Sequence, residues 1–338
     1  MLTRRGARAT GFPTRSVRCI LRRVEPATEP GPTRASPAGR KSALAFFGVL
    51  LALFPFALLA QVAHPVAGLA ATQLVAFLLP ALVATAGSNL KLAPYLRLGA
   101  PRGTLVLLGA LVGGAAYLVA GAVMTVTQWL LPPTWVEAYD LSRLFEGPAW
   151  ERAALALVAA VLAPACEEIT FRGYVQTTLT LRRRPAAAIA GGALLFALLH
   201  LDPVRFPALL LLGAVFGWIT WRAGSIWPAV AAHAANNGLA AALLLASGPP
   251  AGPAPSSFVP SALALGGSAL ALLLFAFQAA APPIPSPAAD ALVLRDPSSP
   301  SIRFELGRVP RALGFAALGG SVVLVALAVM GLARGLRR

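Results

Sequence analysis

The feature that most constrains the fold is a succession of long apolar segments that carry almost no charge. Residues 223–289 contain no Asp, Glu, Lys or Arg, a composition that no soluble surface would tolerate. Only 12% of the 338 residues are charged, against about 25% in soluble domains, and the mean hydropathy is +0.74. We therefore expect an integral membrane protein, an all-α polytopic bundle of about eight to nine transmembrane helices.

Nine segments are candidates to cross the bilayer, since about 20 apolar residues span it. They run roughly over residues 43–63, 69–87, 103–131, 151–181, 185–201, 206–222, 226–246, 259–282 and 312–334. The fifth to seventh are tightly spaced, as short or partly re-entrant helices would be. Loop charges favour eight true crossings, because nine would place the terminal arginines outside.

The chain divides into four regions by composition. Residues 1–41 form a basic tail that is predicted to be disordered, and residues 42–149 hold the N-terminal transmembrane helices. Residues 150–246 form a helical core that contains nearly all the polar residues inside the membrane, so a functional site is expected there. Residues 247–338 supply C-terminal transmembrane helices, with a polar linker at 283–311.

The net charge of +16 does not indicate a nucleic-acid partner. The positive residues lie in the N-terminal tail, in short loops and at the C-terminus, which is the distribution of the positive-inside rule. We therefore expect the lipid bilayer as partner and a cytoplasmic N-terminus. The excess of arginine over lysine favours a bacterial cytoplasmic (inner) membrane. Cys19 and Cys166 allow neither a disulfide framework nor a CxxC metal site.

Two adjacent glutamates, Glu167 and Glu168, interrupt an apolar segment. Carboxylates inside a membrane are costly and usually mark a functional site. Glu168 precedes Arg172 by four residues, the favourable order for an intrahelical ion pair. Glu167 lies about 100° round the helix and has no partner on it. It therefore needs a partner from another helix.

The chain has three histidines, which limits the choice of partners. His64 lies in a turn between the first two segments, where an ordinary interfacial role is expected. His200 and His233 lie on separate apolar helices. One such histidine is usually a satisfied core residue, but two beside a buried glutamate predict a shared site.

The depths of these residues in the membrane are compatible with one site. Glu167 and His200 are each roughly 25 Å along their helices from the turn at 182–184, at 1.5 Å per residue. His233 and Asn237 share a helix face at i,i+4. A carboxylate and imidazoles suit the activation of water, on Zn²⁺ or by direct general-base catalysis. Asn237 would orient a ligand or donate to an oxyanion.

Three motifs in this region carry a resemblance to a known family. Glu167–Arg172 matches EExxxR, Phe196–His200 matches FxxxH, and His233–Asn237 matches HxxxN. In this order the motifs resemble those of the CPBP intramembrane metalloproteases, which include CAAX prenyl protease 2-like and lysostaphin-resistance-protein-A-like enzymes. The resemblance covers about residues 150–245.

The resemblance implies an intramembrane endopeptidase of the CAAX type, a metalloendopeptidase that cuts membrane-associated protein or peptide substrates. By this resemblance Glu167 and His200 activate the water, and Glu168 and Arg172 support them. The set that binds a metal such as Zn²⁺, or stabilises the oxyanion, is Glu167, His200, His233 and Asn237. Metal-bound and metal-free activation both stay open.

A non-catalytic membrane protein is the alternative, either a scaffold or a proton-coupled transporter. Buried Glu and His residues also serve proton relays. A transporter predicts inverted repeats, which the sequence does not show. A scaffold descended from an enzyme predicts the loss of a motif residue, and all are present.

Overall fold

The computed structural model describes residues 37–87, 92–181, 183–248, 254–255 and 257–282. The first 36 residues of the expected basic tail lie outside these ranges. So do the linker expected at 283–311 and the candidate crossing at 312–334.

The described residues form helices and no strands, which confirms the all-α prediction for this part of the chain. The first half contains α1 (Pro37–Ala63), α2 (Pro65–Ala71), η2 (Thr72–Leu78), α3 (Leu79–Ala86), α4 (Leu92–Tyr95), α5 (Gly103–Leu130), α6 (Pro133–Ala138) and η3 (Leu141–Phe145). The second half contains α7 (Ala149–Leu157), η4 (Val158–Leu162), α8 (Ala163–Glu168), η5 (Ile169–Gln176), α9 (Thr177–Thr180), α10 (Pro185–Leu199), α11 (Phe206–Ala223), α12 (Trp227–Ser247) and α13 (Phe258–Ala280).

Seven helical stretches among the described residues are long and apolar enough to cross a membrane. They are Phe46–Ala63, Pro65–Ala86, Gly103–Leu130, Ala149–Thr180, Phe206–Ala223, Trp227–Ser247 and Phe258–Ala280. α10 is apolar but has only 15 residues, in keeping with the expectation of short helices in this part of the chain. These eight helical stretches match the first eight predicted segments.

Two of these seven helical stretches contain π-type turns, where the helix is locally wider. Each such stretch is called a rod below. One such turn is η2 in the rod Pro65–Ala86, and η4 and η5 flank α8 in the rod Ala149–Thr180. Pro164 follows η4 and has no N–H to donate to the preceding turn. Such wide turns in helices are frequent at functional sites.

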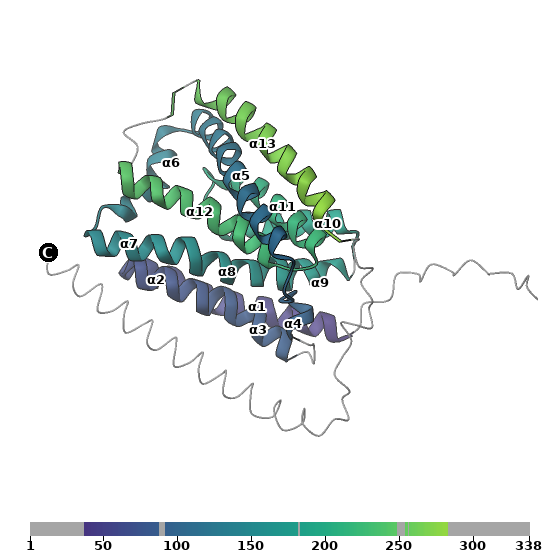
Figure 1. Cartoon of the computed structure of the whole chain (residues 1–338). Helices are drawn as coiled ribbons and strands as arrows, with labels where there is room; N and C mark the ends of the chain where they lie inside the picture. Colours follow the sequence, from purple (N-terminus) through teal and green to yellow (C-terminus); the bar gives the residue numbers. More distant parts are fainter. Residues whose placement is uncertain (1–36, 88–91, 182, 249–253, 256, 283–338) are drawn as a thin grey trace, which may run out of the picture. The chain divides into compact units, whose positions relative to one another are not determined.

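The rod that contains the two glutamates lies between two other parts of the bundle. Figure 1 shows α7, α8 and α9 in one line, with α1 and α2 along one side and α12 along the other. The contacts agree, because α8 packs on η2 and η4 packs on α12. Glu167 and Glu168, at the end of α8, therefore lie between η2 on one side and α12 on the other.

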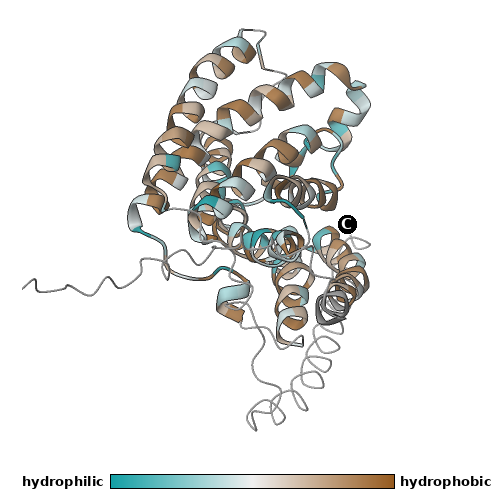
Figure 2. Cartoon of the chain, turned by 90° about the vertical axis from the view of Figure 1, so that its right-hand side faces the viewer, coloured by the Kyte–Doolittle hydropathy of each residue, from teal (hydrophilic) through white to brown (hydrophobic). Residues whose placement is uncertain are grey.

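α5 packs on α12 and α13 through small residues. A Cβ atom at Gly109 would overlap the carbonyl of Pro228, and one at Gly113 would overlap the carbonyl of Ala232. These two glycines are four residues apart, the spacing that lets membrane helices approach closely. Figure 2 shows hydrophobic residues predominating along the helices.

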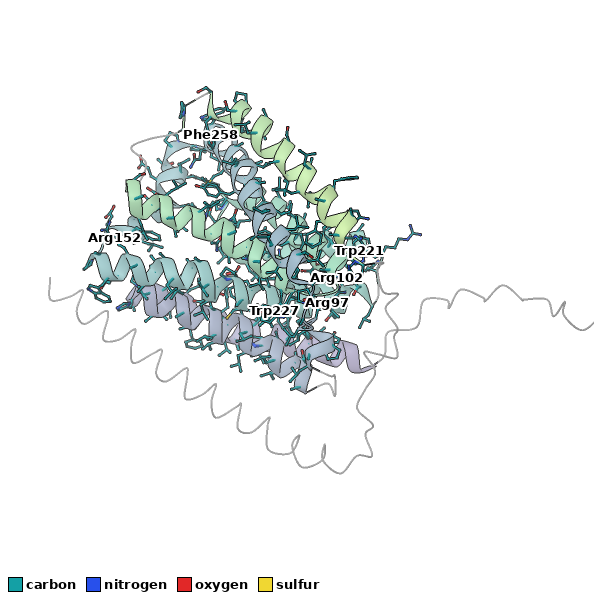
Figure 3. All side chains as sticks on the ribbon, in the orientation of Figure 1. Arg97, Arg102, Arg152, Trp221, Trp227 and Phe258 are labelled. Atoms are coloured by element: carbon teal, nitrogen blue, oxygen red, sulfur yellow. The ribbon has the colours of Figure 1, made fainter. Side chains whose placement is uncertain are left out.

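The loop before α5 is tied to the ends of two later helices. Arg97 Nε donates a hydrogen bond to Thr177 Oγ1 (2.9 Å), and Trp227 Nε1 donates to the carbonyl of Leu98 (3.0 Å). Figure 3 labels Arg97 and Trp227 at one end of the bundle and Arg152 at the other. The loop thus fixes where α12 begins, and with it the position of the residues further along that helix.

Candidate active site

Glu168 is the centre of a buried polar cluster. Its Oε1 accepts a hydrogen bond from Arg172 Nη1 (2.9 Å) and another from His233 Nδ1 (2.9 Å). Arg172 Nη2 donates in turn to the carbonyl of Gly213 (3.1 Å) on α11. The i,i+4 ion pair predicted from the sequence is present. It links η5 to both α11 and α12, so it holds three helices together.

Two aromatic rings cover the Arg172 guanidinium. Its Cζ lies 4.6 Å from the ring centre of Phe196 and 5.5 Å from that of Phe216. A cation over an aromatic face is attracted by the negative face of the ring. The arginine is 1% exposed, so this attraction and its hydrogen bonds stand in for lost hydration.

The contact with Glu168 fixes the tautomer of His233. An ionised carboxylate only accepts hydrogen bonds, so the proton of the neutral imidazole lies on Nδ1. The Nε2 atom then keeps a free lone pair. Nε2 lies 3.9 Å from Glu167 Oε2, and the ring stacks on Phe216 with the ring centres 5.0 Å apart. Glu168 therefore orients His233 toward the other glutamate.

The two oxygens of Glu167 have different surroundings. Oε1 accepts a hydrogen bond from Gln73 Nε2 (2.8 Å), while Oε2 is buried without a hydrogen-bond partner. The 3.9 Å from Oε2 to His233 Nε2 is too long for a direct hydrogen bond. One water molecule can bridge a separation of this size. Glu167 thus has one oxygen held in place and one oxygen with an unused acceptor site.

His200 reaches the same region by way of an aromatic ring. It follows the last residue of α10, and its Nδ1 lies 2.8 Å from the carbonyl of Phe196. The ring of Phe196 is 4.7 Å from the ring of His200 and 5.8 Å from that of His233, measured between centres. His200 also lies close enough to Glu167 and His233 for electrostatic interaction.

Asn237 has a different set of contacts. Its Nδ2 donates to the carbonyl of Ala159 (2.9 Å), and its Oδ1 accepts from Asn236 (3.1 Å). In a π-type turn that carbonyl would pair with the N–H five residues on, at Pro164, which has none. Asn237 supplies the missing donor and joins α12 to η4.

The structure therefore brings the predicted residues together to different degrees. Direct contacts join Glu168, Arg172 and His233, and a 3.9 Å approach adds Glu167. Phe196 links His200 to His233, and Asn237 is attached through η4. His64 has no contact with the group described here: its side chain accepts from the N–H of Ala67 (3.4 Å) at the start of α2.

Gln73 is the contact of Glu167 that sequence reasoning missed. It is 3% exposed and lies in η2, 94 residues before Glu167. A signal was available, because Gln73 is an amide in a stretch, Pro65–Ala86, without any charged residue. Polar residues in membrane helices usually face the bundle interior.

The donor atoms do not form a ready zinc site. Among the described residues no three His, Cys, Asp or Glu side chains are close enough together to hold a metal ion. Glu167 Oε2 and His233 Nε2 are 3.9 Å apart, whereas two ligands of a tetrahedral zinc lie roughly 3.3 Å apart at bond lengths near 2.0 Å. Zinc thus stays a prediction from the sequence, and the mechanism below takes no step through it.

Comparison with known proteins identifies the segment that contains this site. Residues 149–239 match the family described as type II CAAX prenyl endopeptidase Rce1-like. No curated protein and no solved structure matches the chain. The matched residues run from α7 into α12, so they include both glutamates, His200, His233 and Asn237, while Gln73 lies outside them. Residues 149–239 are thus similar to the Rce1-like family of type II CAAX prenyl endopeptidases, in agreement with the resemblance that the three motifs carry.

Proposed function

We propose that this protein is an intramembrane endopeptidase that hydrolyses peptide bonds of membrane-associated proteins or peptides. The observation that carries the proposal is the unpartnered, buried Oε2 of Glu167, which faces Nε2 of His233. Oε2 of the neighbouring Glu168 is also buried without a hydrogen-bond partner, but Oε1 of Glu168 is occupied by two donors, one of them His233, so that Glu168 orients the histidine. Two adjacent carboxylates thus have different environments, which is how acid–base roles are divided in enzymes.

In this proposal Glu167 is the general base. Its Oε2 accepts a proton from a water molecule while the water oxygen attacks the scissile carbonyl carbon. The lone pair on His233 Nε2 accepts the other proton of that water in a hydrogen bond and so orients it. As the peptide C–N bond breaks, the proton held by Glu167 passes to the leaving nitrogen.

His200 and Asn237 complete the assignment. His200 interacts electrostatically with Glu167, and we assign it to share in activating the water. One N–H of the Asn237 amide is used on Ala159, and the second is available to a developing oxyanion. Arg172 acts through Glu168 and does not need to touch the substrate.

Whether a metal takes part is decided by chelation. Cleavage that is lost in the presence of a chelator and restored by Zn²⁺ would place a metal among Glu167, His200 and His233. Cleavage that survives chelation would assign the water to the carboxylate and the imidazoles alone. Each of these two results would decide between the metal-bound and the metal-free activation that the sequence leaves open.

The substrate test uses two internally quenched peptides and the purified protein in proteoliposomes. The peptides have one sequence that ends in Cys-aliphatic-aliphatic-X, and only one of them carries S-farnesyl on the cysteine. We expect wild type to cleave at least one, and Glu167→Ala to cleave neither. Co-expressed membrane proteins extend the panel. Failure of wild type on every substrate would favour the non-catalytic alternative.

We also propose the cytoplasmic membrane of a bacterium as the location, with the N-terminus inside. Arg97 and Arg102 lie at one end of the bundle, as Figure 3 shows, and belong to a short loop of the kind that stays in the cytoplasm. Protease digestion of right-side-out and inverted vesicles tests this. An N-terminal tag that is cleaved only in right-side-out vesicles would reverse the orientation.

A further inference from the structure

We infer that Gln73 is a positioning residue for the reacting carboxylate, supplied by a helix outside the family segment. The inference rests on the proposed function, because it concerns what makes Glu167 an effective base. It assigns to α2, η2 and α3 a part in the chemistry as well as in the bundle.

The contact between Gln73 and Glu167 is direct and buried. Gln73 Nε2 donates to Glu167 Oε1 at 2.8 Å, with 3% and 5% of the two residues exposed. Hydrogen bonds to an ionised acceptor are roughly twice as strong as those between neutral groups. Among the described residues, Gln73 is the only hydrogen-bond partner of the Glu167 carboxylate. This contact therefore decides which way the carboxylate faces.

The two oxygens of the Glu167 carboxylate have different roles: Oε1 is held by Gln73, and Oε2 is the oxygen that reacts in the proposed mechanism. With Oε1 fixed toward η2, Oε2 must point away from Gln73, and it lies 3.9 Å from His233 Nε2. Without the amide the carboxylate would be free to rotate, or would leave two buried oxygens unpaired. Either change moves Oε2 from the place where His233 can share a water with it.

A purely structural role explains Gln73 poorly. Its own Oε1 is buried with no hydrogen-bond partner, which lowers stability. An apolar side chain of the same length would avoid that loss in a membrane helix. The amide is therefore best explained by what its N–H group does for Glu167.

The backbone around Gln73 is held firmly enough to make it a positioning element. Thr72, the preceding residue, donates from Oγ1 to the carbonyl of Gly68 (2.8 Å). A Cβ atom at Gly68 would overlap the backbone of α1 at Gln61, so only glycine permits this approach. The π-type turn of η2 begins at this anchored point and directs Gln73 toward α8.

The test compares Gln73→Met with Gln61→Met in proteoliposomes, on whichever of the two quenched peptides wild type cleaves. Methionine keeps the length and removes the amide. Gln61 is the matched control, since its Nε2 donates to Thr72 Oγ1 (2.7 Å) in the same hairpin and has no described contact with Glu167. The anchoring bond from Thr72 Oγ1 to the carbonyl of Gly68 does not involve the Gln61 side chain and stays in this variant. We measure kcat, KM and the thermal midpoint, and take the same measurements on Glu167→Gln.

We expect Gln73→Met to lower kcat about 10- to 100-fold, the usual cost of removing a partner that orients an active-site ligand. KM and the thermal midpoint should stay close to wild type, because Gln73 touches Glu167 and not the peptide. Gln61→Met should keep the wild-type kcat.

The failures of the two proposals are distinguishable. Wild-type kcat in Gln73→Met, with Glu167→Gln inactive, would overturn the role of Gln73 and leave the protease proposal intact. Equal losses in the Gln61 control would also overturn it, because they would indicate a general packing effect. Wild-type cleavage by Glu167→Gln would overturn the protease mechanism and this inference with it.

Discussion

The two sides of α12 are held by different forces. On one side His233 joins a buried network with Glu168 and Arg172, in which each contact is a directed hydrogen bond. On the other side Ala232 packs against Gly113 of α5, where two backbones meet without any side chain between them. Membrane helices gain little from hydrophobic association, so close packing and polar contacts must do this work.

The α5 side also contains an open apolar groove, with a volume of about 660 Å³. It is lined by small and aliphatic residues of α5, α12 and α13, among them Gly114, Ala235, Gly238 and Leu273. No charged residue lines it. The two sides therefore differ in what they contribute. Changes on the polar side should affect the proposed chemistry, and also stability where the buried ion pair is broken, whereas changes on the glycine side should affect stability first.

The largest expected effect is on the polar side. His200→Ala and Glu167→Gln should each remove detectable proteolysis, since general-base groups contribute about 10²- to 10⁴-fold. Residues that act as a unit lose activity non-additively, so the double variant should be little worse than either single one. Cleavage of the better quenched peptide measures this, with membrane insertion checked by fractionation. Measurable cleavage by both single variants that is lost only in the double variant would show that the two residues act independently.

Arg172→Ala should come next, with loss of folded protein as well as activity. Removing one partner of a buried ion pair leaves an uncompensated charge, at about 3–5 kcal/mol. Yield after detergent extraction and the thermal midpoint are the measurements. Arg183→Ala is the control, because Arg183 is exposed in the loop before α10. A normal yield and activity in Arg172→Ala would mean that the ion pair matters little.

Gly113→Ala probes the other side of α12 and should be milder. The added Cβ would overlap the carbonyl of Ala232, so α5 and α12 must separate, at about 1–3 kcal/mol for overpacking. Gly114→Ala is the matched control, since a Cβ there would lie 3.7 Å from Leu239, an ordinary contact. A lower thermal midpoint in Gly113→Ala alone would show that close packing of α5 on α12 stabilises the bundle. Equal midpoints in the two variants would contradict this role of Gly113.

His64→Ala should have the smallest effect. The residue only caps α2 through a 3.4 Å contact with the N–H of Ala67. Loss of a helix cap costs about 0.5–2 kcal/mol, with the lower end expected for so long a contact. The peptide assay should give wild-type kcat. A loss as large as that of His200→Ala would show that the wrong histidines have been assigned to the site.

Much of the architecture could be predicted from the sequence because the periodicity and length of apolar segments determine membrane helices. The first eight predicted segments correspond to helices, although α1 begins at Pro37, earlier than expected. The Glu168–Arg172 pair followed from spacing alone. Local geometry along one helix is what a sequence specifies best.

Contacts between helices were harder to predict. Depth along a helix placed Glu167 level with His200, but the printed sequence does not say how each helix is rotated. In the structure His233 Nε2 lies 3.9 Å from Glu167 Oε2, and Gln73 donates a hydrogen bond to Glu167 Oε1. The π-type turns also change the rotation of the residues beyond them, and nothing in the apolar pattern marks them. The partner of Asn237 depends on such a turn.

In the proposed mechanism Glu167, and not its neighbour Glu168, is the reacting carboxylate. The most direct measurement is kcat of purified Glu167→Gln on the peptide that wild type cleaves, with the thermal midpoint taken on the same sample. The exchange keeps the shape of the side chain and removes the base. We expect no detectable cleavage and a thermal midpoint close to wild type. Cleavage at the wild-type rate by this folded variant would contradict this mechanism.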